Sequence, residues 1–153
     1  MSIDVSDSSG VDFGDSELLA AQASFLLDQL NLDPDCELSI ALVDESEMER
    51  LHVEWMDLPG PTDVLSFPMD ELRPGPTDGP RPLGVLGDII LCPTVAAQQG
   101  AAAGHSTLAE MELLLTHGVL HLLGYDHAEP DEHAVMFALQ EDLLAAWRSE
   151  GTA

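Results

Sequence analysis

Three histidines, His117, His121 and His127, lie within eleven residues of one another in the segment THGVLHLLGYDH. The first two are four residues apart, so on a helix their imidazole rings project from one face, one turn apart. Gly124 precedes the third, and glycine readily adopts the left-handed conformation with which a helix ends and the chain turns back. Three imidazole ligands leave one position open on a tetrahedral Zn²⁺, which is typical of catalytic zinc, whereas structural zinc has four protein ligands. The spacing therefore predicts one zinc ion and an enzyme.

A packing interpretation of the same segment is also open, because the segment is rich in leucine and must contribute to the core. A single histidine in such a helix would be a hydrogen-bonded core residue. Three histidines at ligand spacing, half of the six in the chain, favour the metal site.

The spacing of these histidines coincides with the metzincin protease motif H-E-x-x-H-x-x-G-x-x-H. Metzincins carry a glutamate as general base directly after the first ligand, and this chain has Gly118 there. Peptide hydrolysis by that mechanism is therefore not expected, whereas a zinc ion that lowers the pKa of bound water also suits phosphodiester hydrolysis. The general base stays open: Asp126 either orients an imidazole or assists the water, or it is an ordinary turn residue.

The segment HGVLHLLGYDH resembles the signature H-G-x-L-H-L-x-G-Y-D-H of the YbeY family at every defined position. Two further segments, PTDVLSFP at 61–68 and LGDIILCP at 86–93, are similar to the two central strand motifs of that family. The resemblance extends over most of the chain, from about 37 to 147.

This resemblance implies a zinc-dependent endoribonuclease of the single-strand type that acts in 16S rRNA 3′ end maturation, ribosome biogenesis and ribosome quality control. It implies that His117, His121 and His127 are the metal ligands. The implied partners are ribosomal RNA and the small ribosomal subunit or its proteins, with no membrane and no DNA. Two alternatives stay open: a non-catalytic ribosome-assembly factor whose zinc holds the fold, and a zinc hydrolase of another substrate class.

One position departs from the family pattern. Many members carry an arginine shortly before the PTxVLSFP segment, and this chain has Met56 at that place, which cannot bind phosphate. Arg50 and Arg73 lie on either side and are candidates for substrate binding. Both can equally be solvated surface arginines.

The net charge argues against unaided RNA binding. The chain has four arginines, no lysine and 29 acidic residues, which gives a formal charge of −25. RNA-binding domains usually present basic surface, because neutralisation of phosphates drives much of their affinity. The zinc ion, helix amino termini or a basic partner can supply positive charge instead. The acidity also fits a high-salt cytoplasm or a composition bias of the lineage.

Length and composition predict a cytoplasmic protein. The 153 residues suffice for a domain with a buried core. We see no signal peptide and no apolar run of membrane-spanning length. Cys36 and Cys92 form no CxxC pair and are expected to be buried, reduced thiols.

Hydrophobic periodicity predicts helices and strands that are mixed along the chain. Strands are expected at 3–5, 37–43, 63–67 and 87–92. Helices are expected at 17–30, 45–55 and 94–103. A fourth helix should start at the capping box formed by Thr107 and Glu110, and a last one should follow residue 129. The run RPGPTDGPRP at 73–82 is predicted to be a loop.

These elements predict a single α/β (α+β) domain over residues 1–153. We expect a small mixed sheet of about four strands surrounded by helices. The helix at 45–55 should turn Met48, Leu51, His52 and Trp55 inward. The metal site is expected on the long helix after Thr107 and in the turn that follows it.

Overall fold

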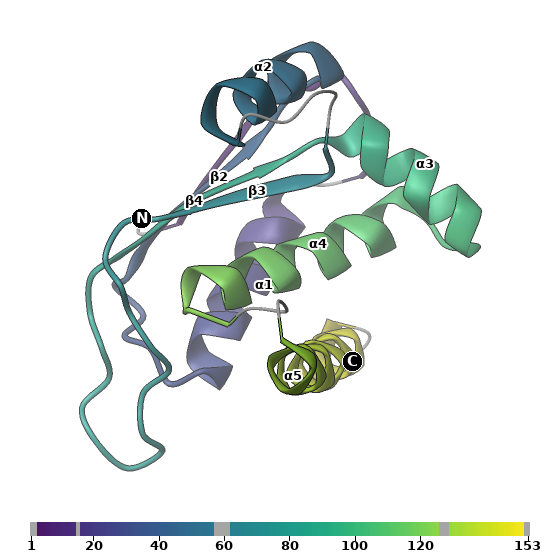
Figure 1. Cartoon of the computed structure of the whole chain (residues 1–153). Coiled ribbons are helices and arrows are strands. Elements are labelled where there is room, and N and C mark those ends of the chain that lie inside the picture. Colours follow the sequence, from purple (N-terminus) through teal and green to yellow (C-terminus); the bar gives the residue numbers. More distant parts are fainter. Residues whose placement is uncertain (1–2, 15, 57–61, 126–128, 152–153) are drawn as a thin grey trace.

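The computed structural model describes residues 3–14, 16–56, 62–125 and 129–151, and at its centre lies a four-stranded mixed sheet (Figure 1). The strand order is β1 (Ile3–Asp7), β2 (Glu37–Leu42), β4 (Val85–Leu91) and β3 (Val64–Pro68). Neighbours β1, β2 and β4 are parallel, and β3 runs antiparallel to β4 at the edge of the sheet. The predicted α/β fold is therefore confirmed.

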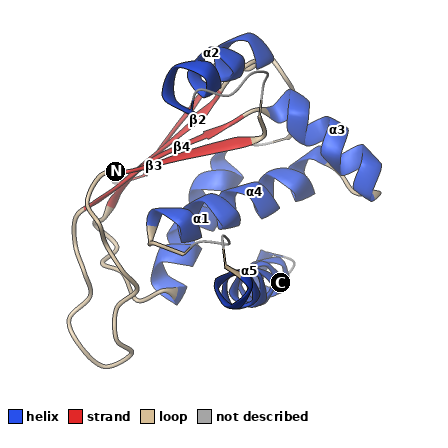
Figure 2. Ribbon diagram, in the orientation of Figure 1, coloured by secondary structure: helices blue, strands red, loops and turns tan. Residues whose placement is uncertain are grey.

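Helices cover both faces of the sheet (Figure 2). In the described part of the chain they are α1 (Glu17–Gln29), α2 (Glu45–Met56), α3 (Pro93–Ala103), α4 (Thr107–Leu122) and α5 (Pro130–Gly151). Helix α2 lies on one face, α1 and α4 lie on the other, and α5 packs outside α4 and α1. Helix α1 is the crossover that two parallel neighbouring strands, here β1 and β2, require.

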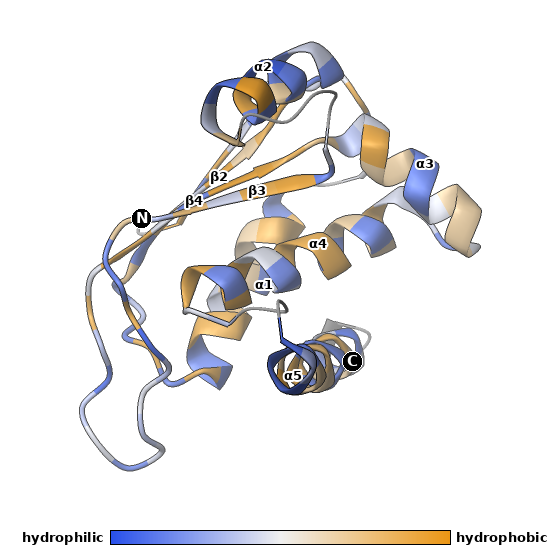
Figure 3. Ribbon diagram, in the orientation of Figure 1, coloured by the Kyte–Doolittle hydropathy of each residue, from blue (hydrophilic) through white to orange (hydrophobic). Residues whose placement is uncertain are grey.

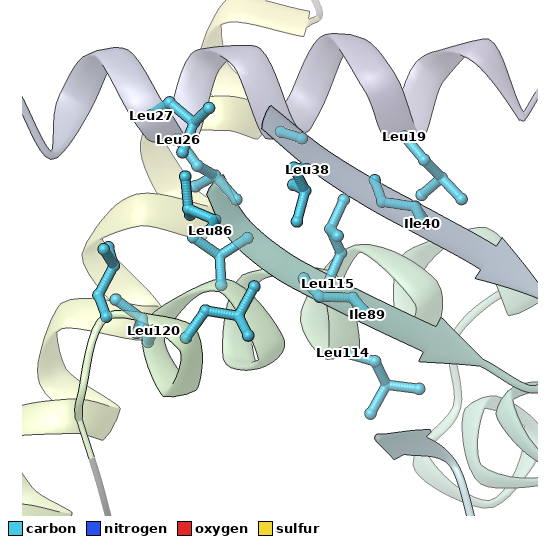
Figure 4. Close-up of a cluster of buried hydrophobic side chains, with 14 of the residues drawn as sticks. Leu19, Leu26, Leu27, Leu38, Ile40, Leu86, Ile89, Leu114, Leu115 and Leu120 are labelled. Atoms are coloured by element: carbon cyan, nitrogen blue, oxygen red, sulfur yellow. The ribbon is translucent and has the colours of Figure 1, made fainter. Parts of the chain in front are cut away.

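The main core lies between the sheet and helices α1 and α4. Side chains alternate between the two faces of a strand, and β2 turns Leu38, Ile40 and Leu42 toward the helices, where they are buried. Figure 4 shows Leu38 and Ile40 beside Ile89 of β4 and Leu115 of α4. Apolar residues follow the strands and the length of α4 in Figure 3. Because each such side chain stabilises the fold by about 1.5–3 kcal/mol on burial, this core fixes the position of α4.

A β-bulge in β4 changes which side chains of this strand face the main core. Glu37 of β2 pairs with Val85 and the next residue pairs with Gly87, so one residue of β4 is extra at this point. Leu86 and Ile89, which would face opposite sides of a regular strand, are both fully buried as a result. Gly87 has a φ of 137° and passes close to Phe67 of β3, which explains why glycine stands there.

The face of the sheet under α2 is less completely covered. Met48 of α2 is buried against this face, as predicted. Trp55, in contrast, is 63% exposed and meets Phe67 edge to face, with ring centroids 6.1 Å apart. Trp55 therefore lies on the side of α2 that faces the sheet, as predicted, but it is not buried, because it lines an open cavity of about 400 Å³ between α2 and the sheet.

The amino terminus of α4 differs from the predicted capping box. Ser106 is the N-cap, and its hydroxyl accepts a hydrogen bond from the Ala109 N–H at 3.1 Å. Thr107 is the first helical residue. Glu110 instead contacts His105, with Oε1 2.6 Å from Nε2. Both serine and threonine suit an N-cap, so sequence alone placed the start one residue late.

Other predictions from the sequence are confirmed by the fold. Cys36 and Cys92 are free and buried, and burial raises the pKa of both thiols. Most of the segment at 73–82 is loop and connects β3 to β4. Among the described residues, no helix has the length and apolar character needed to cross a membrane.

Candidate metal centre

Helix α4 brings His117 and His121 together on the side that faces the edge strand β3. Their Nε2 atoms are 3.0 Å apart, and the rings stand nearly perpendicular, with centroids 4.5 Å apart. Both side chains are half-buried. The four-residue spacing predicted this convergence, because one helical turn separates the two residues. The structure therefore brings together two of the three predicted ligands.

The two imidazoles form part of the wall of a cleft of about 470 Å³. Strand β3 forms the opposite wall. The lining residues are Met56, Asp63, Val64, Leu65, Ser66, Pro68, His117 and His121. The cleft is thus an open groove between a helix and a sheet edge, a place where an extended polymer can approach the histidines.

The geometry of the histidine pair fits zinc. A zinc ion binds imidazole nitrogen at about 2.0–2.1 Å. The 3.0 Å separation of the two Nε2 atoms is shorter than twice that bond length, so one ion can reach both. Neutral imidazole is also a donor that zinc commonly binds in enzymes. The described residues therefore supply a two-nitrogen half-site.

The third predicted ligand, His127, and the candidate base, Asp126, lie outside the described residues. Within the described ranges no three histidine, cysteine or carboxylate side chains are placed to hold one ion. The roles of His127 and Asp126 stay predictions.

Helix α5 holds the other ring nitrogen of His117. Nδ1 of His117 lies 2.8 Å from Oε1 of Gln140, whose side chain is only 3% exposed. An amide oxygen can only accept a hydrogen bond, so this contact favours the tautomer that carries its proton on Nδ1, in which Nε2 keeps its lone pair for a metal. Partners of this kind fix the orientation of a ligand and raise its basicity.

Replacing Gln140 by leucine is expected to weaken zinc binding by roughly 10- to 100-fold, the usual effect of losing such a partner. Glutamate at the same position should largely restore affinity, because a carboxylate oxygen also accepts from Nδ1. Competition against a chromophoric zinc chelator measures both. Equal zinc affinities of the leucine variant and the parent protein would show that Gln140 does not orient the ligand.

The same face of α5 extends this contact toward the surface. Phe137 packs on His117, with ring centroids 5.8 Å apart, and His133 stacks on Phe137 at 4.2 Å. His133 is exposed, and it is the outermost ring of this row. Residues 133, 137 and 140 have the spacing of one helical face. That spacing was the sequence signal that could have revealed Gln140.

The structure explains why Gly118 stands where metzincins carry a glutamate. Gly118 faces the sheet and not the cleft. A Cβ added to it would lie 3.2 Å from both Cγ2 of Ile89 and Oγ of Ser66. A larger side chain at this position would press on the side chains of Ile89 and Ser66, so glycine lets α4 approach the sheet closely.

The two candidate substrate-binding arginines differ in their surroundings. Arg50 donates hydrogen bonds to Glu47 and Glu54, both at 2.6 Å. These hydrogen bonds raise the pKa of Arg50, and they lower the pKa of Glu47. Arg73 lies against Gly124, the residue that ends the turn after α4. Met56 lines the cleft itself.

Comparisons with known proteins identify the family. The chain matches the family model described as Endoribonuclease YbeY over residues 4–148. It is 61% identical to the Endoribonuclease YbeY of Thermobifida fusca over 148 residues, covering 97% of this chain and 95% of that protein. It is 60% identical to that of Clavibacter sepedonicus over 144 residues, which are 94% of each.

A solved structure agrees with the fold. The solution structure of TM1509 from Thermotoga maritima matches with a TM-score of 0.65 at 25% identity. The match covers 97% of this chain and 93% of that one. These matches extend from the first strand into the last helix and include the histidine signature. The chain therefore belongs to the endoribonuclease YbeY family.

Proposed function

We propose that this chain is a zinc-dependent endoribonuclease that cleaves single-stranded RNA, with His117, His121 and His127 holding one zinc ion. The observation that carries the proposal is that the imidazoles of His117 and His121 converge in the wall of a cleft, with their Nε2 atoms 3.0 Å apart. Membership of the endoribonuclease YbeY family supports the substrate class.

The chemistry divides between the ion and the chain. Zinc, when bound, would polarise a phosphate oxygen and lower the pKa of a water molecule toward neutrality. Gln140 keeps the proton of His117 on Nδ1, and Phe137 packs against the same ring, so the ligand is held in one orientation. A proton acceptor is also needed. Asp126 is the candidate from the sequence, and Asp63 is a carboxylate in the lining of the cleft.

We further propose that the substrate is ribosomal RNA, processed in the cytoplasm at the 3′ end of the 16S rRNA during ribosome biogenesis and quality control. The small ribosomal subunit or its proteins would be the partner. Such a partner would strengthen RNA binding, because a chain with a charge of −25 on average repels a polyanion. Basic ribosomal surface would supply the positive charge that this chain lacks.

One alternative has support from the same charge: a non-catalytic assembly factor whose zinc only holds the fold. A second alternative, a zinc hydrolase acting on peptides, is opposed by Gly118, which stands where metzincins carry their glutamate base. The open groove beside the histidine pair favours catalysis over the assembly-factor role.

The test uses protein stripped with a chelator and then reloaded with zinc. Its substrates are an RNA oligonucleotide spanning the 3′ precursor end of the small-subunit rRNA, the DNA of the same sequence, and a peptide library. We expect zinc-dependent cleavage of the RNA and no cleavage of the DNA or the peptides. A His117→Ala protein purified in parallel controls for contaminating ribonuclease. If none of the substrates is cleaved with or without zinc, and the protein co-sediments with small ribosomal subunits, the result would instead support the assembly factor.

A further inference from the structure

Three of the four arginines are occupied by carboxylates of the same chain. Arg50 bridges Glu47 and Glu54 on α2. Arg81 binds Asp28 at 2.9 Å. Arg148 of α5 lies 3.6 Å from Glu112 and also donates to the Ala109 carbonyl oxygen at 3.2 Å. In a chain without lysine, these three cations are therefore largely neutralised by their own neighbours.

The fourth, Arg73, has different surroundings. It is exposed, and its Nη1 donates to the carbonyl oxygen of the preceding residue at 3.1 Å. Among the carboxylates that the structure describes, none lies within ion-pair distance of its guanidinium group. A phosphate ligand can therefore bind this cation without first displacing one of those carboxylates.

The Arg73 guanidinium packs against Gly124, which has no side chain to exclude it. A Cβ on Gly124 would lie 2.6 Å from both Cζ and Nη1 of Arg73, so the guanidinium occupies the space that any other residue would fill. Gly124 has a φ of 92°, which also favours glycine. Its N–H donates to the carbonyl oxygen of His121 at 3.0 Å. Arg73 is thereby held at the turn that directly follows a candidate metal ligand.

The path of the chain places Arg73 beyond one end of the cleft. Strand β3 runs beside α4, with Ser66 next to Gly118. The loop after β3 then passes the carboxyl end of α4, where Arg73 meets Gly124 (Figure 1). Met56 and Asp63 line the cleft where β3 begins. Met56 and Arg73 are therefore on opposite sides of the histidine pair.

We propose that Arg73 binds a phosphate of the RNA strand that occupies the cleft, on the His121 side of the scissile bond. The proposal rests on the proposed endoribonuclease function and adds a substrate-positioning residue to it. Guanidinium binds phosphate through two parallel hydrogen bonds. Arg73 thus supplies a cationic contact to the strand from the loop between β3 and β4.

A purely structural role would have other consequences. Arginine near the carboxyl end of a helix interacts favourably with the last carbonyl groups. If Arg73 did only this, its removal would lower stability and leave RNA affinity unchanged. The two roles can therefore be separated by measuring melting temperature and RNA binding on the same variant.

The decisive comparison is Arg73→Ala against Arg81→Ala. Both variants remove one positive charge from the same loop, but Arg81 is bound to Asp28, away from the cleft. We expect Arg73→Ala to raise KM for an RNA oligonucleotide by about 10- to 100-fold, since hydrogen bonds to charged groups contribute about 1.5–3 kcal/mol. Arg81→Ala should change KM less than about threefold, as expected for a surface ion pair. Zinc content and melting temperature should match between the two.

Salt dependence supplies an independent readout. Loss of one phosphate contact should reduce the slope of log affinity against log salt by about 0.7 for single-stranded RNA. The slope should fall in Arg73→Ala, recover in Arg73→Lys and stay at the parent value in Arg81→Ala and Arg50→Ala. Equal slopes and equal KM values in Arg73→Ala and Arg81→Ala would overturn the proposal, as would an effect confined to Arg50→Ala.

The two proposals fail in different ways. If the zinc-loaded parent protein cleaves no RNA, the proposed function fails, and the salt slope of RNA binding still tests Arg73. If the parent protein is active and Arg73→Ala behaves like Arg81→Ala, the function stands and only the role of Arg73 is wrong.

Discussion

Replacing His117 by alanine is expected to abolish zinc binding and RNA cleavage together. The imidazole is one of the two whose Nε2 atoms converge in the cleft, and Gln140 holds its other ring nitrogen. Loss of the ligand itself should cost more than the roughly 10- to 100-fold that follows loss of a ligand's hydrogen-bond partner. Elemental analysis of zinc per chain and single-turnover cleavage of an RNA oligonucleotide measure the two effects.

His105→Ala is the matched control for this experiment. It removes an imidazole from the other end of α4, where His105 contacts Glu110 and not the cleft. Zinc content and cleavage should stay at the parent level, with melting temperature recorded for all variants. A His117→Ala protein that is free of zinc and still cleaves at the parent rate would contradict the metal-dependent mechanism.

Replacing Gly87 by alanine is expected to be the most destabilising small substitution in the sheet. The added Cβ would lie 2.1 Å from the carbonyl oxygen of Phe67, and the φ of 137° strains any residue with a side chain. Strain and overpacking together should lower the free energy of unfolding by roughly 2 to 6 kcal/mol. Urea denaturation followed by circular dichroism gives the value.

Gly104→Ala separates the two causes. Gly104 also has a positive φ, 83°, but nothing lies within 4 Å of the Cβ that alanine would add. This variant should lose only about 1 kcal/mol, the cost of the backbone conformation. If Gly87→Ala were no more destabilising than Gly104→Ala, the close approach of β4 to β3 would not be a constraint on the fold.

Much of the fold could be predicted because its signals are local. The alternation in the segment at 37–42 identified β2, and helical periodicity identified α1, α2 and α4. The four-residue spacing of His117 and His121 was enough to predict that their rings converge. Each of these features depends on the geometry of one element, which the sequence encodes directly.

Features that depend on two distant elements were not predictable in the same way. The hydrogen bond between His117 and Gln140 joins α4 to α5, and the Arg73 contact joins a loop to Gly124. The exposure of Trp55 depends on the cavity that remains between α2 and the sheet. Such contacts are set by packing between elements, and the sequence only restricts which residues are available for them.

The distribution of the arginines changes the meaning of the acidic composition. Arg50, Arg81 and Arg148 neutralise carboxylates within the chain and leave the surface strongly negative. An RNA strand would therefore find attraction mainly at the metal centre and at Arg73. Together with a basic partner, this arrangement would restrict binding to the cleft and suppress non-specific contacts with RNA elsewhere.

The proposed mechanism depends on His117, His121 and His127 holding one zinc ion and leaving one coordination position for water or substrate. Zinc K-edge X-ray absorption of the reloaded protein tests it most directly, because imidazole rings and sulfur ligands give distinct scattering. We expect one zinc per chain with three imidazoles and one non-protein oxygen. A sulfur ligand, a fourth protein ligand, or an unchanged spectrum in His117→Ala would contradict the account.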